Sequence, residues 1–511
     1  MARTSEFASR RDAVSPRRIN RFRSLIDMIS PSERLAFVKD GDRWTRARLA
    51  REVDRLAAGL KAMGVGIGDR VALHLRNGPE IAVAYFACFR IGAIAAPLNL
   101  RFKTAELDDM LRRILPSVYI GHAELYRLVA PIETAVLGAA SRYVVGEPED
   151  GMAQSWTALH RDPAGMVFEE PDPNALALLL STSGTTGKPK LVTHSHATMI
   201  CKATMFVNGE IQEGDINAFF LPMVHGSGIT FLLSDLLAGA SLVMLDANDP
   251  DGILDAVETH RCTHVISTPT GFAHLMECQR RRPRDVSPLR ICLTGGDVCP
   301  SSLQEVFPYH FGLPLRTFWA STEGGSSFTY GLQPGPVSRP LAGVEIRLVD
   351  AEDRPVPRGE SGEMMLRGPH IALGYWNGPG KLERFPDGWY RTGDLMREDE
   401  DGNFWFVARA KDLIVRGGSN ISPVEVEQIL ADHPDVRDAG VVGVPDPVLG
   451  QRVVGFVQLA EGVDADRLED ILRRASARLA DYKMPERLIA VTSIPRNGLG
   501  KIDRTELARM A

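Results

Sequence analysis

Residues 176–195 read LALLLSTSGTTGKPKLVTHS, and this stretch decides how the rest of the chain is interpreted. The apolar run at its start predicts a buried strand. The strand leads into a loop whose glycines permit a tight turn and whose hydroxyl and ammonium groups are the donors that a polyphosphate needs. We therefore predict a phosphate-binding loop built by Thr182, Ser183, Gly184, Thr185, Thr186, Gly187, Lys188 and Lys190.

The loop differs from the Walker P-loop. In the P-loop, two glycines flank four residues and a Lys-Ser or Lys-Thr pair follows. Here Gly184 and Gly187 are separated by two threonines, and Pro189 follows Lys188. The loop by itself indicates phosphate binding, and a polar surface turn is the alternative.

Outward from the loop, strands alternate with helices. Apolar residues at helical spacing follow Thr45, and Gly64 supplies a helix stop. Short apolar runs at 241–245 (SLVML), 263–268 (THVIST) and 290–295 (RICLTG) predict strands. Such alternation predicts an α/β fold with layered, mostly parallel sheets.

The pattern changes near Pro340. Residues 343–407 contain short strands split by Gly, Pro and Asp, which predict a small antiparallel sheet or a β-barrel-like subdomain. After Lys411, helical and strand patterns alternate over about 100 residues, enough for a separate small α+β domain. We expect a large N-terminal domain over 1–410, with the antiparallel β subdomain at about 340–407, and a small mobile C-terminal domain over 411–511.

Composition excludes several classes of protein. The 511 residues carry a formal net charge of −6, which argues against a nucleic-acid partner. Six cysteines in so long a chain do not form a disulfide framework, and the composition fits a reducing cytoplasm. The apolar segment Ile81–Leu98 is interrupted by Arg90 and Pro97, so it predicts a buried helix and turn and no membrane span. For the Arg-rich residues 1–23 we expect a solvated terminus, with a transit-like signal as the alternative.

Five segments resemble, in the same order, the motifs of the adenylate-forming enzymes, which include acyl-CoA synthetases, luciferases and peptide-synthetase adenylation domains. The first is STSGTTGKPK at 181–190. The others are FWASTEGG at 318–325, WYRTGDL at 389–395, ARAKDLIVRGGSNISPVEVE at 408–427 and PRNGLGKIDR at 495–504. The resemblance covers essentially the whole chain and is greatest to an acyl-CoA synthetase.

The resemblance implies a role for each matched residue in activating the acid. Lys501 would bridge the attacking carboxylate and the α-phosphate during adenylation, and Thr322 would touch a phosphate. Glu323 would help to hold Mg²⁺. The ring of Trp319 would stack on adenine, with a merely buried Trp as the alternative. Asp394 and Arg409 would contact the ribose.

The resemblance also implies sites for the acid and for CoA. His225 would line the acyl pocket, although a buried core histidine is an equal alternative. The pair Gly295 and Gly296 would lie beside the substrate carboxylate and adenine. The pair Gly417 and Gly418 would border a thiol channel after the C-terminal domain swings about a hinge at Lys411. Phe231 and Phe272 are further candidates for the acid pocket.

The sequence departs from the family pattern at four places. Trp319 replaces the usual Tyr, Val224 an aromatic residue, and Leu191 and Ala408 the usual glycines. The Arg-rich run at 280–284 either contacts the phosphates of CoA or is a solvated surface.

The resemblance implies an ATP-dependent carboxylic acid–CoA ligase that works through an acyl-adenylate. ATP, Mg²⁺ and CoA are then the expected cofactor and co-substrates, and the acid is expected to be medium-chain aliphatic or aromatic. An adenylating enzyme that loads a carrier protein is the first alternative, and an inactive nucleotide-binding sensor is the second. The sequence leaves the oligomeric state open, with a homodimer among the options.

Overall fold

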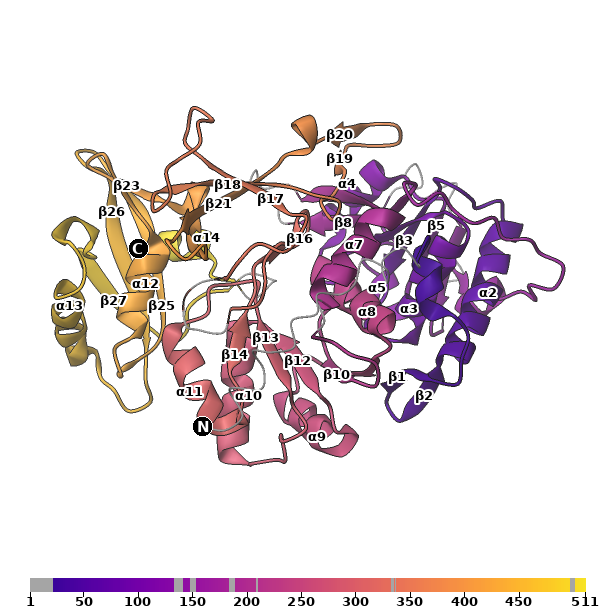
Figure 1. The fold of residues 1–511 in the computed structure, drawn as a ribbon, viewed down its shortest axis with the longest axis horizontal. Helices are drawn as coiled ribbons and strands as arrows, with labels where there is room; N and C mark the ends of the chain where they lie inside the picture. The colour runs from indigo at the N-terminus through magenta and orange to yellow at the C-terminus, as the bar shows by residue number, and fades with distance from the viewer. Residues whose placement is uncertain are drawn as a thin grey trace.

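The computed structural model describes residues 22–132, 141–147, 153–182, 189–207, 210–331, 335, 337–496 and 501–511. Two large sheets with their helices make up most of the chain, and a small C-terminal unit lies beside α11 (Ser301–Phe311) and β21 (Tyr390–Glu398) (Figure 1). The mixed α/β fold with a large N-terminal and a small C-terminal domain is therefore confirmed.

The first large sheet contains the strand that precedes the phosphate loop. Its central strands pair in parallel, because helices carry the chain back between them. Beyond β8, a hairpin turns the chain antiparallel. Across this sheet, the described strands are β20 (Leu382–Arg384), β19 (Gly374–Trp376), β9 (Lys190–Ser195), β8 (Leu176–Thr182), β4 (Ile94–Pro97), β3 (Arg70–His74), β5 (Val118–His122), β6 (Ser141–Val145) and β7 (Gln154–Ser155).

The second large sheet is parallel except for its antiparallel edge strand β2. Its core joins that of the first sheet through α3, α7 and α8. Across the sheet, the described strands are β14 (Leu315–Thr317), β13 (Ile291–Thr294), β12 (His264–Ser267), β10 (Ile216–Phe219), β11 (Ser241–Met244), β1 (Leu35–Lys39) and β2 (Asp42–Thr45).

Helices cover the large sheets. The helix expected after Thr45 is α2, and the segment Ile81–Leu98 forms α3 followed by a buried strand, β4. The described helices are α2 (Arg46–Ala62), α3 (Pro79–Arg90), α4 (Thr104–Ile114), α5 (Ala123–Tyr126), α7 (His196–Val207), α8 (Gly226–Ala238), α9 (Pro250–His260), α10 (Pro269–Arg281) and α11. Short 3₁₀ turns are η1 (Leu25–Ile29), η2 (Trp156–Leu159), η3 (Pro386–Gly388) and η4 (Ala410–Asp412).

The region after Pro340 forms an antiparallel sheet, one of the two forms that the sequence predicts. Its described strands, in order, are β17 (Glu345–Val349), β18 (Ser361–Arg367), β21 and β22 (Phe404–Arg409). A separate hairpin, β15 (Ala320–Ser321) and β16 (Gly325–Ser326), packs through neighbouring Trp319 against this sheet.

The C-terminal unit is α+β, as expected. Its described strands run in the order β24 (Ser419–Ile421), β23 (Ile414–Arg416), β26 (Gly450–Leu459), β25 (Val436–Asp446), and β27 (Arg487–Val491) lies parallel to β26. The helices are α12 (Pro423–Ala431), α13 (Leu468–Ser476) and α14 (Arg504–Met510), with the 3₁₀ turns η5 (Ala465–Arg467) and η6 (Asp481–Lys483). The unit has its own apolar core around Val426, Leu430 and Val441.

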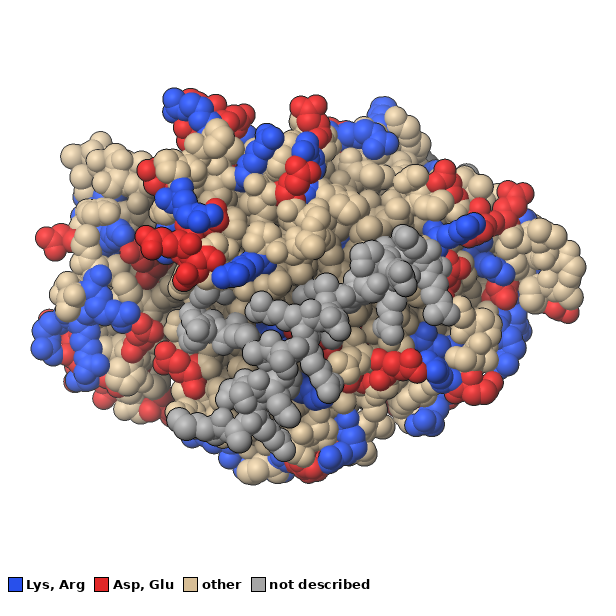
Figure 2. All heavy atoms as spheres, in the orientation of Figure 1, with Lys and Arg blue, Asp and Glu red and all other residues tan. Residues whose placement is uncertain are grey.

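The surface mixes both signs of charge. Figure 2 shows Lys and Arg interspersed with Asp and Glu over the visible face. Within the described ranges, no helix combines the length and the apolar composition that crossing a bilayer requires.

Candidate active site

The hairpin of β8 and β9 holds the ends of the phosphate loop. Thr182 and Lys190 are paired across it, so the loop begins and ends at the same end of these two neighbouring strands. The Lys190 ammonium lies 4.3 Å from the centre of the Tyr375 ring, a cation–π contact that joins the loop to β19. The predicted phosphate ligands Ser183, Gly184, Thr185, Thr186, Gly187 and Lys188 lie outside the described residues.

The turn between β15 and β16 carries Thr322 and Glu323, and hydrogen bonds from several described groups hold it. The Gly324 amide donates to the Ser321 hydroxyl oxygen at 2.8 Å, and the Ala372 amide donates to the Glu323 carbonyl at 2.8 Å. The Tyr375 hydroxyl donates to Glu323 Oε1 at 3.2 Å. The Lys202 ammonium donates to the Thr322 carbonyl. This turn is therefore rigidly connected to α7 and β19.

Asp394 brings together two of the other predicted residues. Its carboxylate is buried on β21, where the Trp319 indole N–H donates to Oδ2 at 2.7 Å. Arg409, opposite it on β22, forms an ion pair with Oδ1 at 2.7 Å. Burial raises the pKa of Asp394, and the Arg409 charge and the Trp319 bond oppose that rise. Trp319, Asp394 and Arg409 are thus in one connected group, and Trp319 is both buried and bound to the candidate ribose ligand.

Lys501 faces this group from the C-terminal unit. Burial lowers the pKa of Lys501, as does the charge of Arg409, while Asp297 and Asp394 oppose the shift. The adjoining segment is tied to the large domain by Arg496, which lies 3.6 Å from Asp297. Charges of the large domain therefore act on Lys501, and Arg496 contacts the same domain.

The two glycines after β13 are required by their surroundings. A side chain at Gly295 would collide with the Phe318 ring, because its Cβ would lie only 2.7 Å from Cζ. Gly296 has a φ of +84°, a left-handed conformation that favours glycine. These observations explain the glycines by packing and backbone conformation and leave their predicted role beside adenine and the carboxylate as a proposal.

His225 lies next to the Thr322 turn. It is the N-cap residue of α8, and a Cβ on its neighbour Gly226 would be 3.3 Å from Thr322 Oγ1. Burial lowers the pKa of His225 to about 4, and the charge of Arg101 contributes. His225 is thus held neutral near the turn.

The remaining predicted residues lie elsewhere. Gly417 and Gly418 form the turn between β23 and β24 with φ of +56° and +83°. The Gly417 amide donates to the Leu449 carbonyl at 2.8 Å, within the C-terminal unit. The two other acid-pocket candidates are fully buried in apolar cores: Phe231 packs against Phe206 and Phe318, and Phe272 packs against Phe307.

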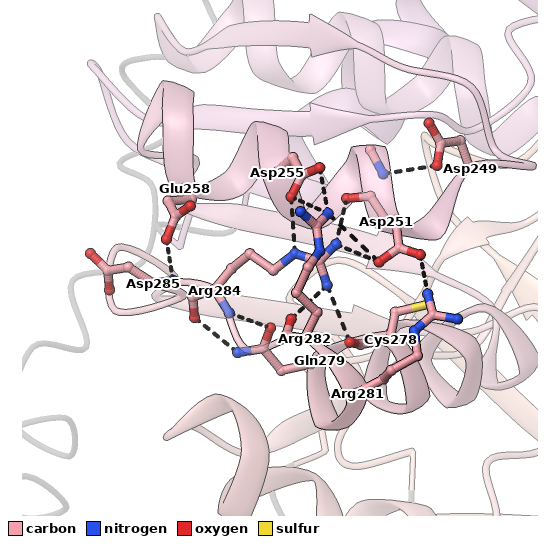
Figure 3. A network of polar contacts seen from close by, with 11 residues as sticks. Asp249, Asp251, Asp255, Glu258, Cys278, Gln279, Arg281, Arg282, Arg284 and Asp285 are labelled. Atoms are coloured by element: carbon pink, nitrogen blue, oxygen red, sulfur yellow. Dashed lines mark hydrogen bonds and ion pairs between the residues drawn. The ribbon is translucent and has the colours of Figure 1, made fainter.

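The Arg-rich run after α10 is engaged with carboxylates. Figure 3 shows Arg281, Arg282 and Arg284 directed toward Asp251 and Asp255 of α9. Arg284 is the buried member, with 2% of its side chain exposed, and its guanidinium is 2.9 Å from Asp255 Oδ1. These contacts join α9 to α10. Arg281 and Arg282 remain 66% and 58% exposed, so the run is a largely solvated surface whose charges are paired with carboxylates.

The sequence reasoning missed Lys202, His194, Asp297 and Tyr375. Lys202 had a signal, since it is an isolated charge in the otherwise apolar helix HATMICKATMFV. Asp297 follows the two glycines of LTGGD, but its partner Arg496 comes from the far end of the chain. Tyr375 carried no local signal for its bond to Glu323.

The Thr322 turn fits a magnesium ion that is shared with a nucleotide. Mg²⁺ is usually bound through one or two carboxylates together with substrate phosphates. Glu323 is a buried carboxylate at the turn, and within the described residues no group of three or more His, Cys, Asp or Glu side chains could hold a metal unaided. The donor set therefore suits an ion that depends on phosphate oxygens for its other ligands.

Comparison with known proteins agrees with this geometry. A family model described as "AMP-binding enzyme" matches residues 29–376, and one described as "AMP-binding enzyme C-terminal domain" matches 425–501. A feruloyl-CoA synthase from Amycolatopsis sp is 34% identical over 92% of this chain and 94% of that protein. A medium-chain fatty-acid–CoA ligase from Escherichia coli K12 is 32% identical over 91% and 85% of the two chains.

A solved structure also matches nearly throughout. It is an anthranilate CoA ligase in complex with anthranoyl-AMP, which superposes with a TM-score of 0.87 at 26% identity. The match covers 96% of this chain and 97% of the other. The chain therefore belongs to the family of AMP-binding, adenylate-forming enzymes, as an AMP-forming acid–CoA ligase.

Proposed function

We propose that this chain activates an aromatic or medium-chain aliphatic carboxylic acid with ATP and Mg²⁺, then transfers the acyl group to CoA. The observation that carries the proposal is the position of Lys501. Although it comes from the end of the chain, it is half-buried where the carboxylates of Asp297 and Asp394 act on it. A cation delivered there can offset the repulsion between two anions that must react.

In the first half-reaction, an oxygen of the acid attacks the α-phosphorus of ATP, and pyrophosphate leaves. Lys501 would bridge the attacking carboxylate and the α-phosphate. Asp394, aligned by Trp319 and Arg409, would accept hydrogen bonds from the ribose hydroxyls. Thr322 would donate to a phosphate, and Glu323 would hold Mg²⁺, which supplies charge neutralisation on the phosphates.

In the second half-reaction, the thiol of CoA attacks the acyl carbon and AMP leaves. We propose that residues 411–511 rotate about Lys411 relative to residues 1–410, withdrawing Lys501 and presenting Gly417 and Gly418. Both residues have left-handed backbone conformations, and as glycines they have no side chain. The turn therefore leaves room for a pantetheine arm. Closure that completes a site and then remodels it orders the two half-reactions.

The acid class is supported by relatives and by the surroundings of the site. One relative is named for ferulate and another for medium-chain fatty acids. Near the Thr322 turn, His225 is held neutral by burial. A neutral His225 would contribute no cation to pair with a second carboxylate, which agrees with an apolar or aromatic body on the acid.

A pyrophosphate-release screen tests the proposal. Short, medium, long, aromatic and dicarboxylic acids are each supplied with ATP and Mg²⁺. We expect pyrophosphate with an aromatic or medium-chain acid, then AMP and a thioester when CoA is added. Acyl transfer to the phosphopantetheine of a carrier protein, with none to CoA, would show that a carrier protein is the acceptor. ATP binding without adenylate formation from any acid would indicate a nucleotide sensor.

A further inference from the structure

Lys202 is an unusual residue for the interior of α7. The residue is 2% exposed, and its helix is otherwise nearly apolar. Moving an ammonium group out of water is costly unless opposite charge and hydrogen bonds compensate, so lysines are rarely buried in this way. Nothing in the mechanism proposed above uses this amine.

The ammonium of Lys202 is directed at the turn between β15 and β16. It donates to the Thr322 carbonyl, and its Nζ lies 3.2 Å from His194 Nε2. His194 Nε2 is itself 3.0 Å from the same carbonyl oxygen. Burial lowers the pKa of Lys202 to about 7, and the negative charge of Glu323 opposes that shift. The amine is thus compensated by the carbonyl of one proposed site residue and the carboxylate of the next.

The stem of Lys202 is fixed as well as its head. Gly325 has a φ of +56°, and a Cβ at that position would lie 3.0 Å from Lys202 Cγ and 3.1 Å from Cε. The backbone of β16 therefore packs directly on the methylene chain. With stem and head both held, the amine has one defined position beneath the turn.

The contact falls on the one peptide group that joins Thr322 to Glu323. Rotation of that peptide plane would change the backbone angles on both sides of it, and so would move the Thr322 hydroxyl relative to the Glu323 carboxylate. The same carbonyl lies 3.0 Å from His194 Nε2, and the turn is tied further through Ser321, the Glu323 carbonyl and the Tyr375 hydroxyl. Lys202 adds a charged donor at the peptide between the two groups proposed to meet the nucleotide and its metal.

We propose that Lys202 is a positioning residue for adenylation, which holds the Thr322–Glu323 peptide and acts through these two residues without contacting ATP or the acid. The inference rests on the proposed roles of Thr322 and Glu323. It predicts that loss of the amine disturbs the metal-dependent part of nucleotide binding, while the adenosine contacts made by Trp319 and Asp394 remain.

The test compares three variants with the full-length protein. Lys202→Met removes the charge and the donor at similar volume, and Lys202→Gln retains an N–H donor without charge. Met199→Leu is the control, because Met199 is a fully buried apolar residue of the same helix. For each protein, calorimetry measures the affinity for AMP without metal and for ATP with Mg²⁺, neither of which requires knowledge of the acid. Thermal unfolding measures the stability of each.

We expect Lys202→Met to weaken Mg²⁺–ATP binding roughly 10-fold while AMP affinity changes by less than about 3-fold, since small displacements of positioned groups are costly. The Mg²⁺–ATP affinity of Lys202→Gln should lie between those of Lys202→Met and wild type. The affinity of Met199→Leu should equal that of wild type. Where the acid screen supplies a substrate, the adenylation kcat should fall in the same order.

Several results would overturn the assignment. Unchanged or tighter Mg²⁺–ATP binding in Lys202→Met would mean that the amine does not position the turn. An equal loss of AMP and Mg²⁺–ATP affinity, with a lower unfolding temperature, would mean a purely structural role. If Lys202→Met does not fold, an equal loss of AMP and Mg²⁺–ATP affinity in Lys202→Gln would reject the proposal. Failure of wild type to adenylate any acid would reject the proposed function alone, because the binding comparison does not depend on the acid.

Discussion

A buried lysine, Lys202, and a half-buried one, Lys501, approach the site from different parts of the molecule. Lys202 belongs to α7 of the large domain, where its amine meets a carbonyl and an imidazole of the same domain. Lys501 comes from the C-terminal unit, and its charge is balanced by Asp297 and Asp394 but opposed by Arg409 and Lys411. Burial lowers the pKa of both. One cation is therefore part of the fixed structure of the large domain, whereas the position of the other depends on how the two domains meet.

This contrast has a functional consequence. A charge fixed inside one domain stays with the Thr322 turn throughout the reaction, and its removal should disturb the turn at all times. A charge carried by a second domain can serve one half-reaction and leave before the next. Variants that affect only one of the two steps therefore distinguish the two lysines.

The largest effect is expected for Lys501→Ala. Loss of a cation that contacts the reacting groups should slow adenylate formation roughly 100-fold or more. Thioester formation from pre-made acyl-adenylate should be largely retained, because the proposed second orientation does not use Lys501. Separate assays of pyrophosphate release and of thioester formation measure the two steps.

Lys483→Ala provides the matched control for Lys501→Ala. Lys483 is a lysine of the same unit, paired with Glu425 at 2.7 Å, and its loss should leave both steps near wild type. Equal loss of both steps in Lys501→Ala would contradict the division of labour between the two orientations.

A smaller effect is expected at the contact between the domains. Asp297 lies 3.6 Å from Arg496, and its charge also acts on Lys501. Asp297→Asn should weaken the adenylation orientation and slow adenylation about 10-fold, with less effect on the thioester step. Arg496→Ala should have a similar but smaller effect, because Arg496 also pairs with Asp438 at 2.7 Å.

The double variant sharpens this prediction. Because Asp297 and Arg496 form one contact, combining Asp297→Asn with Arg496→Ala should cost less than the sum of the two single changes in activation free energy. The matched control is Arg509→Ala, which removes an exposed ion pair within α14. Fully additive losses would show that the two residues act independently.

The same contrast explains what the sequence could and could not predict. Local patterns sufficed for β8 and for α2, because the spacing of apolar residues can be seen in consecutive residues, whereas the antiparallel return of β9 was not predicted. The short run at Ile94–Pro97 is a strand where a turn was expected, since brief apolar runs do not distinguish the two. Motif resemblance led to Lys501 and Asp394, which lie near each other in the structure.

The contacts that position these groups were beyond sequence reasoning. Trp319 was expected to stack on adenine or to be buried, and its bond to Asp394 depends on how the β15 hairpin packs on β21. Lys202 and Thr322 are likewise brought together only by the fold, since a lone lysine in a helix is usually on the surface. Such supporting residues act through contacts with residues that are distant in the sequence. These contacts produce no local sequence pattern from which they could be predicted.

The smallest expected effect is on stability in acid, near Lys202. His370 is buried with Nε2 3.1 Å from the Ser327 hydroxyl oxygen. Burial lowers the pKa of His370 to about 3, and the charge of Lys202 contributes. In the unfolded chain this pKa returns to about 6.5, so between these values the unfolded state binds a proton that the folded state does not. The stabilising contribution is complete above about pH 6.5 and is lost as the pH falls toward 3.

His370→Asn should therefore flatten the fall in unfolding free energy on acidification. The change in slope is at most one proton, about 1.4 kcal/mol per pH unit. Urea unfolding between about pH 7 and 5 measures it, and His274→Asn, at an exposed position of α10, should leave the slope unchanged. Parallel curves for His370→Asn and wild type would show that His370 is not held neutral. Because the charge of Lys202 contributes to the low pKa of His370, Lys202→Met should also flatten the dependence of unfolding free energy on pH, whereas Lys501→Ala should not. This comparison distinguishes Lys202 from Lys501 by a measurement that involves no catalysis.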